Sequence, residues 1–156
     1  MAWGCDTMSR INFYRLGLLL NNEYCTISFL GRYLTQDNPS SNKSLLESEV
    51  KLLSSHNIDI VSLMQKETED INHFTAANGL ADAYTAVEAA AALGQPNGTP
   101  IYFCVDCDPS DDEITDKVLP YFNRANMLLS VSVFNPNGYL LGAYGNSRVL
   151  KKIKAN

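Results

Sequence analysis

Two aspartates separated by one residue, Asp106 and Asp108, follow an apolar run in the middle of the chain. The run 101–105 suits a buried strand, and Pro100 suits its first position because proline has no amide proton to donate. Side chains alternate along a strand, so both aspartates point to one side if the chain stays extended. Neighbouring carboxylates can act as a general acid and its ionised partner, or bind a hard cation such as Mg²⁺. The ordinary alternative is that an Asp-x-Asp pair before a helix belongs to a loop and a helix cap.

A helix is expected directly after these aspartates. Ser110 and Glu113 have the spacing of a capping box, in which each side chain bonds the backbone of the other residue. The predicted helix covers 111–129, and Pro120 should break or kink it. The carboxylates thus stand at the carboxyl end of a strand, where α/β folds hold their functional residues.

The same alternation of strand and helix extends along the whole chain. Strand patterns cover 2–6, 26–34, 58–64, 101–105 and 139–144, and helical patterns cover 9–21, 45–55, 76–93, 111–129 and 148–154. Alternation predicts an α/β fold with a parallel sheet. We expect a (β/α) TIM-barrel type of sheet with about five units and sequential strand order 1-2-3-4-5. An open doubly wound sheet, with order 2-1-3-4-5, is the alternative.

The number of units has its own consequence. A TIM barrel needs eight strands to close, so this chain is expected to form a single domain over residues 1–156 that is incomplete at its C-terminus. Its first and fifth strands should be open edges with unpaired backbone groups. We therefore expect an exposed apolar seam, and with it poor solubility, self-association or dependence on a partner segment.

Composition narrows the function classes. The chain has 156 residues, of which 46% are hydrophobic and 19% charged, as in a globular domain. Its net charge is −5 and no basic patch rich in aromatic residues occurs, which argues against nucleic acid as the main partner. No apolar run reaches membrane-spanning length, and the first residues lack the pattern of a signal peptide. A cytoplasmic location is the default expectation, with no membrane partner.

Four cysteines are present: Cys5, Cys25, Cys104 and Cys107. The spacing of Cys104 and Cys107 is that of half a redox or zinc motif, but no second cysteine pair or histidine stands at metal-binding distance in the sequence. Positions three apart on a strand face opposite sides, so these two thiols should diverge and stay unbonded. We expect buried free cysteines, no metal site and no cofactor.

Polar residues end each of the expected strands. In chain order they are Asp6, Arg32, Gln65, Asp106 with Asp108, and Tyr144. The carboxyl ends of parallel strands meet at one edge of the sheet, so these side chains are expected to line one cleft. Each also has a structural explanation: a helix cap for Asp6, an ion pair for Arg32 and a core position for Tyr144.

Several short motifs occur together in an order that resembles a known family. They are Gly4-Cys5-Asp6-Thr7, Gly31-Arg32-Tyr33-Leu34, Gly79-Leu80-Ala81-Asp82-Ala83, Ala92-Leu93-Gly94-Gln95-Pro96, the stretch 98–108, and Ala143-Tyr144-Gly145-Asn146. As a set they resemble the glycoside-hydrolase-like TIM-barrel domains once labelled a domain of unknown function. Those domains are similar to the family 25 lysozymes, which cleave peptidoglycan. The resemblance covers nearly the whole chain.

The resemblance implies a site for glycan, in which two carboxyl groups flank the scissile bond. Asp108 matches the acid of the fourth strand, Asp106 its partner, and Asp6 the carboxylate of the first strand. The substrate-binding residues would be Arg32, Gln65, Tyr102 and Tyr144. The lysozymes have Asp-x-Glu where this chain has Asp106-x-Asp108, and their last three strands have no counterpart here. The resemblance also makes extracellular or cell-wall action an alternative to the cytoplasmic default.

Three functions remain as hypotheses. The first is a glycoside hydrolase-like domain that cleaves cell-wall glycan by carboxylate acid–base chemistry. The second is a non-catalytic glycan-binding module on the same scaffold. The third is a metal-dependent sugar-nucleotide enzyme in which Asp106 and Asp108 hold Mg²⁺ or Mn²⁺. It ranks lower because no glycine-rich phosphate loop accompanies the pair. For the first hypothesis, Asp108→Asn is predicted to abolish turnover while binding and stability persist.

Overall fold

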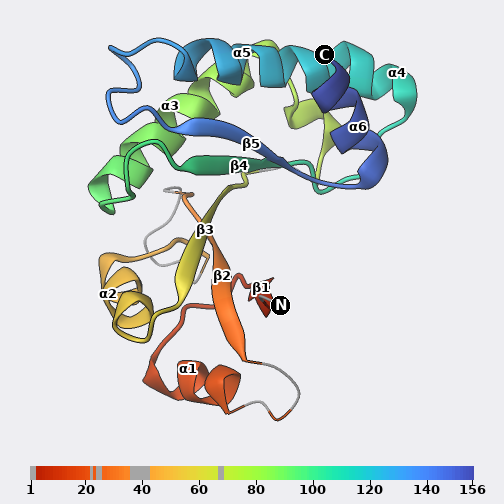
Figure 1. Cartoon of the computed structure of the whole chain (residues 1–156). Helices are drawn as coiled ribbons and strands as arrows, with labels where there is room; N and C mark the ends of the chain where they lie inside the picture. The colour runs from red at the N-terminus through yellow and green to blue at the C-terminus, as the bar shows by residue number, and fades with distance from the viewer. Residues whose placement is uncertain (1–2, 22, 24–25, 36–42, 67–68) are drawn as a thin grey trace.

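The computed structural model describes residues 3–21, 23, 26–35, 43–66 and 69–156 (Figure 1). The predicted start of the first strand at residue 2 and the thiol of Cys25 lie outside these residues. The elements are β1 (Trp3–Asp6), α1 (Phe13–Leu20), β2 (Ile27–Tyr33), α2 (Glu47–Ser55), β3 (Asp59–Met64), η1 (Ile71–His73), α3 (Ala76–Ala92), β4 (Pro100–Cys104), α4 (Asp111–Glu113), the π-helical turn Ile114–Val118, α5 (Leu119–Leu129), β5 (Leu140–Tyr144) and α6 (Ser147–Ala155).

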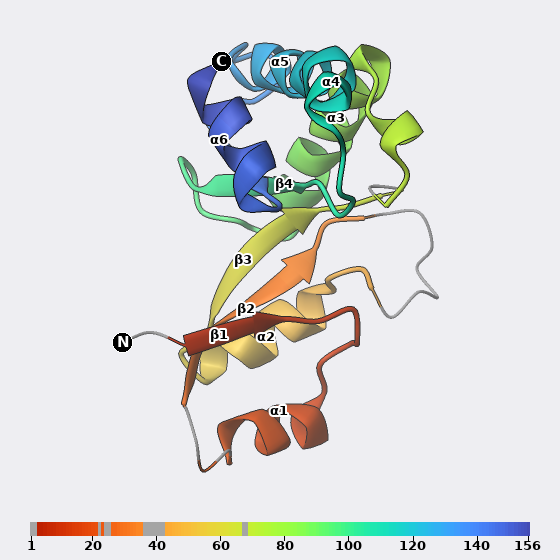
Figure 2. The same ribbon diagram turned by 90° about the vertical axis from the view of Figure 1, so that its right-hand side faces the viewer.

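The five strands form one open parallel sheet in the order β1-β2-β3-β4-β5. This confirms the predicted α/β class and the sequential order of a barrel-type sheet, as opposed to the order 2-1-3-4-5. Strands β1 and β5 are the two edges. Figures 1 and 2 show α3 and α5 beside the β4–β5 end of the sheet, and α1 and α2 beside the β1–β3 end.

The main core lies between β4 and the helices α3 and α5. Ile101 and Phe103 of β4 are fully buried there, as expected for alternate residues that face the helices. The two helices approach closely at Gly79, where an added Cβ would lie 2.2 Å from the carbonyl oxygen of Tyr121. A second cluster lies between β2, α1 and α2. Its buried residues are Ile11, Leu16, Ile27, Leu30, Leu53 and Ile58.

The opposite face of the sheet, here called the inner face, carries a smaller cluster. Tyr33, Leu63 and Cys104 are buried in it, and Tyr102 packs against them. Tyr102 lies flat across the neighbouring strand, because its ring occupies the space that a side chain on Gly142 would need.

Pro120 does not break the helix that contains it. The turn before it widens, and the amide of Leu119 bonds the carbonyl of Ile114, five residues back. Pro120 then lies in the first turn of α5, where a missing amide proton is tolerated. Of the predicted break or kink, the break does not occur, and the helix instead widens into a π-helical turn just before the proline.

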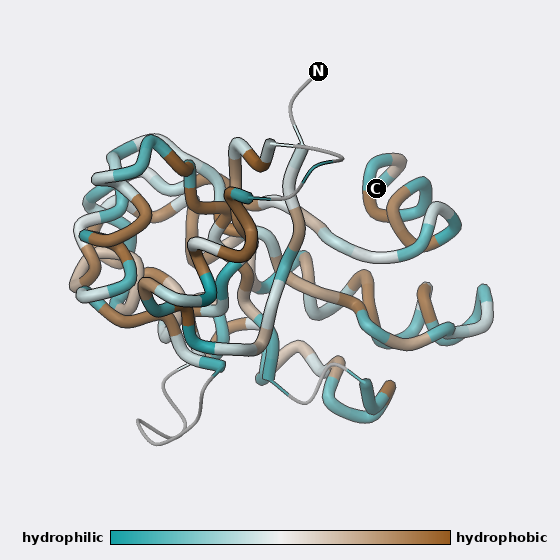
Figure 3. Tube along the Cα trace, turned by 90° about the horizontal axis from the view of Figure 1, so that it is seen from below, coloured by the Kyte–Doolittle hydropathy of each residue, from teal (hydrophilic) through white to brown (hydrophobic). Residues whose placement is uncertain are grey.

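The last helix, α6, alternates between hydrophobic and hydrophilic colours in Figure 3. Val149 is its buried residue, and lysines 152 and 154 occupy its last turn, where cations favour the helix dipole. Within the described residues, no helix combines the length and apolar character needed to cross a membrane.

Candidate functional site

Two predicted site carboxylates are each held by an uncharged donor. The Tyr33 hydroxyl donates to Oδ2 of Asp6 over 2.9 Å. The amide Nε2 of Gln65 donates to Oδ2 of Asp106, also over 2.9 Å. These two bonds fix the orientation of each carboxyl group.

Asp6 and Asp106 both raise the pKa values of the same two neighbours, Tyr144 and Cys104. The charge of Asp6 is the main cause that raises the pKa of Tyr144, and Asp106 adds to it. Burial raises the pKa of the Cys104 thiol to about 12, and the charges of Asp106 and Asp6 act in the same direction. Cys104 and Tyr144 are register partners on β4 and β5. Asp6, at the end of β1, and Asp106, just after β4, are therefore both near enough to Cys104 and Tyr144 to affect their pKa values.

We call this group the mouth. Its members are Asp6, Tyr33, Gln65, Asp106 and Tyr144. Tyr144 is 45% exposed at its rim, where it can meet a ligand. Tyr33 was missed by the sequence analysis, although the alternation from Gly31 places it on the same face as Asp6.

Asp108 lies beside the mouth and makes its own contacts. Its Oδ1 accepts hydrogen bonds from Asn146 Nδ2 at 3.1 Å and from Arg148 Nη2 at 2.6 Å. The same guanidinium donates to the carbonyl of Pro109. These bonds join the loop after β4 to the start of α6. The depression at this corner, about 770 Å³, is lined by Val105, Asp106, Cys107, Asp108, Tyr144, Gly145, Asn146, Ser147 and Arg148.

The structure does not bring Arg32 to the mouth. Its neighbours in β2, Gly31 and Tyr33, face inward, so Arg32 faces the helices. There it is fully buried in an ion pair with Glu49 at 3.1 Å, and its Nη1 donates to the carbonyl of Thr7. The expected substrate-binding role for Arg32 does not fit this geometry. Its bond to Thr7, the residue after Asp6, makes it a support for the mouth.

The cysteines agree with their prediction only in part, because Cys104 is buried whereas Cys107 is partly buried and Cys5 is exposed. Cys104 and Cys107 are not bonded to each other, as predicted. Across the described residues, no group of three or more His, Cys, Asp and Glu side chains is arranged to hold a metal ion.

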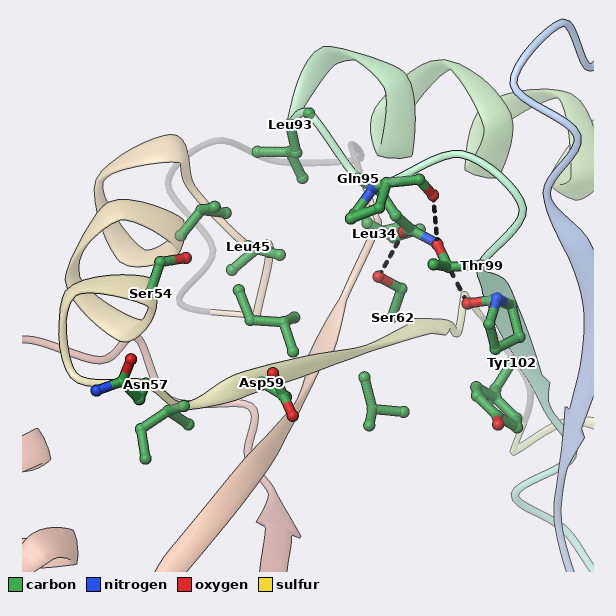
Figure 4. Close-up of a pocket in the computed structure, with 17 residues that line it drawn as sticks. Leu34, Leu45, Ser54, Asn57, Asp59, Ser62, Leu93, Gln95, Thr99 and Tyr102 are labelled. Carbon is green, nitrogen blue, oxygen red and sulfur yellow. Dashed lines mark hydrogen bonds between the residues drawn. The ribbon is translucent and has the colours of Figure 1, made fainter.

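A second cavity, of about 640 Å³, runs along β3 between α2 and the end of α3 (Figure 4). Its polar side chains bond one another: Ser62 Oγ donates to Gln95 Oε1 at 2.6 Å, and Gln95 Nε2 donates to Thr99 Oγ1 at 2.9 Å. Tyr102 lines this cavity, but the aspartates of the mouth do not. The mouth is therefore the stronger candidate for chemistry.

Comparison with known proteins places the chain in a family. The chain is 35% identical over 150 residues to the uncharacterized protein YbfG of Bacillus subtilis, a match that covers 92% of this chain and 20% of YbfG. It is 28% identical over 146 residues to the uncharacterized protein FadG of the same species, covering 93% of this chain and 24% of FadG. The chain thus spans about a quarter or less of the length of these relatives.

Solved structures show the same fold. The Tat-secreted protein Rv2525c of Mycobacterium tuberculosis, in complex with HEPES, has a TM-score of 0.67 and 25% identity over 83% of this chain and 64% of its own. An uncharacterized protein of B. stearothermophilus has a TM-score of 0.72 and 18% identity over 99% of this chain and 68% of its own. The sequence from residue 25 to residue 156 matches the family model of the Rv2525c-like, glycoside hydrolase-like domain. This chain belongs to that family.

Proposed function

We propose that the mouth binds a cell-wall glycan and that Asp6 and Asp106 act on one of its glycosidic bonds. One observation carries this proposal: Asp6 and Asp106 each accept a hydrogen bond from a neutral donor, and both raise the pKa of Tyr144. Membership of a glycoside hydrolase-like family supports the class of ligand.

Glycoside hydrolysis needs one carboxyl group that gives a proton to the leaving oxygen and one carboxylate that stabilises or attacks the cationic sugar carbon. In the mouth, Asp6 and Asp106 supply the two groups. Tyr33 and Gln65 hold them in place, so little reorganisation is needed when charge develops on the sugar. Tyr144, exposed at the rim, offers an aromatic face and a hydroxyl to the sugar ring.

The solved relatives support a ligand of this kind. Rv2525c is described in complex with HEPES and in complex with L-tartrate, both of which carry hydroxyl groups, as sugars do. Rv2525c is a Tat-secreted protein, which supports action outside the cytoplasm. For the present chain, cell-wall glycan as the ligand follows from these likenesses and stays a proposal.

A specific observation favours a second candidate, a glycan-binding module without catalysis. Asp108 stands where the lysozymes have their acid, yet its Oδ1 already accepts hydrogen bonds from Asn146 and Arg148. These bonds tie Asp108 to the start of α6. Binding needs the mouth alone, so it persists even if Asp108 donates no proton.

Purified peptidoglycan tests both candidates. The measurements are the release of reducing ends and cosedimentation of the protein with the polymer. The variants are Asp6→Asn, Asp106→Asn and Asp108→Asn, with Asp112→Asn as an exposed acidic control on α4. Calorimetric titration with Mg²⁺ and Mn²⁺ tests the metal-dependent alternative in parallel.

Catalysis by the mouth predicts that Asp6→Asn and Asp106→Asn each lower turnover by about 10²–10⁴-fold while cosedimentation persists, as for the loss of an acid–base group. The control should behave as the unmodified protein. Binding without any release of reducing ends, lost in the mouth variants, selects the binding module. No binding and no turnover would reject the proposal.

A further inference from the structure

A buried polar cluster lies under the helix side of the mouth, centred on Asp82 of α3. Asp82 is only 2% exposed. Its Oδ2 accepts a hydrogen bond from the Tyr121 hydroxyl at 2.8 Å and lies 2.7 Å from Nε2 of His73. Its Oδ1 lies 3.4 Å from Nζ of Lys66. One carboxylate therefore contacts α5, η1 and the residues directly after β3.

The packing of α3 on α5 does not by itself call for this carboxylate. The two helices already meet where Gly79 lies against the backbone of Tyr121. Burying a charge is costly, and an ion pair in the interior is weak grounds for stability alone. Such groups are better attested as devices that select one arrangement of the chain.

Asp82 contacts the chain just after β3, at the dipeptide Gln65-Lys66. It follows Met64, the last residue of β3, so the strand ladder no longer determines its course. Successive side chains of an extended chain point to opposite sides. Gln65 is buried and reaches inward to Asp106, while Lys66 reaches the other way to Asp82. One ion pair and one hydrogen bond thus hold the two sides of the same peptide.

We propose that Asp82 is a positioning residue for the mouth. By holding Lys66, it fixes the backbone of Gln65 so that the Gln65 amide points at the Asp106 carboxylate. His73, which contacts the same carboxylate, fixes the other end of the connection to α3. The importance of this arrangement for glycan rests on the proposed function. The arrangement itself is a property of the free protein and is tested without a ligand.

The test is an NMR measurement on the side-chain NH₂ group of Gln65. Its resonance is recorded in the unmodified protein, in Asp82→Asn and in Lys66→Met. Asp106→Ala supplies the position of the amide without its acceptor. Lys51→Met is the matched control, because it removes a lysine from an exposed ion pair with Glu47 on α2.

We expect the resonance to move most of the way to its position in Asp106→Ala when either Asp82 or Lys66 is replaced, and to stay in place in Lys51→Met. An unmoved resonance in folded Asp82→Asn or Lys66→Met overturns the proposal. If Asp82→Asn does not fold, Lys66→Met, which leaves the buried carboxylate with Tyr121 and His73, decides alone.

Glycan binding is measured on the same variants, and the two results separate the two proposals. A shifted amide without any glycan binding keeps the positioning role and rejects the proposed function. Glycan binding with an unmoved amide resonance keeps the proposed function and rejects the positioning role of Asp82. If the amide shifts and glycan binds, Asp82→Asn should weaken glycan binding in the otherwise unmodified protein. It should have little further effect in a Gln65→Ala background, because both changes remove the same hydrogen bond between Gln65 and Asp106.

Discussion

The side chain of Asp6 lies across Gly31 of the neighbouring strand. The two residues are register partners on β1 and β2, and a Cβ built on Gly31 would lie 2.8 Å from the Asp6 Cβ. The same atom would lie 3.1 Å from Cδ1 of Leu63. The missing side chain at position 31 is therefore the space through which Asp6 reaches the hydroxyl of Tyr33.

Gly31→Ala should displace Asp6, break its bond with Tyr33 and reduce glycan binding or turnover to the level of Asp6→Asn. The cost in stability should be about 1–3 kcal/mol, as for other overpacked sites. Gly17→Ala in α1 is the matched control, since no atom lies within 4 Å of its added Cβ. It should raise stability by about 0.5–1 kcal/mol, because alanine favours a helix over glycine. Equal loss of function in both variants would contradict the steric account.

Arg32→Met should lower the free energy of unfolding by about 3–5 kcal/mol, because it leaves Glu49 buried without its partner. The double variant Arg32→Met/Glu49→Gln should recover part of that loss, since no uncompensated charge remains. Lys51→Met, which breaks an exposed pair, should change little. Urea unfolding measures all three. A loss no larger than that of Lys51→Met would show that the buried pair does not support β2.

The raised pKa of Cys104 predicts a decline of stability in alkaline solution. The folded thiol keeps its proton up to about pH 12, whereas the unfolded thiol loses it near the ordinary value of 9.0. The unfolded state then binds fewer protons, so stability falls as pH rises from 9 toward 12. Cys104→Ala should show a shallower decline between pH 9 and 10 in urea unfolding. Identical slopes in the two proteins would remove Cys104 as a cause.

Self-association through the β5 edge is the fourth expectation. Leu140, the first residue of β5, is 56% exposed on an open sheet edge. Leu140→Lys should shift the protein toward the monomer in sedimentation experiments, because a charge on an edge opposes pairing. Val133→Lys, at a residue 76% exposed in the turn before β5, should not. A chain that is monomeric at all concentrations and melts in one transition would contradict the expected open-edge behaviour.

Local patterns in the sequence determined most of the fold. Strand and helix periodicity placed all five strands, and their alternation with helices predicted the parallel sheet and its sequential order. The period of two placed Asp106 and Asp108 on one side of the extended chain, and Asp6 was recognised by its position at the end of the first strand. These features were readable because each depends on neighbours a few residues apart. The same alternation predicts that Arg32 points toward the helices, since its neighbours Gly31 and Tyr33 face the other side. Its position at the end of a strand led instead to the expectation that it lines the cleft.

Only the tertiary structure decided which partners the polar side chains take. Tyr33 reaches Asp6 across 27 positions of the chain, and Arg148 reaches Asp108 across 40. Asp82, which the sequence shows only as part of the motif 79–83, contacts Lys66, His73 and Tyr121 from three separate segments. Such pairings depend on strand register and on the paths of long connections. No local pattern encodes them, because they form only when the whole sheet and its helices are assembled.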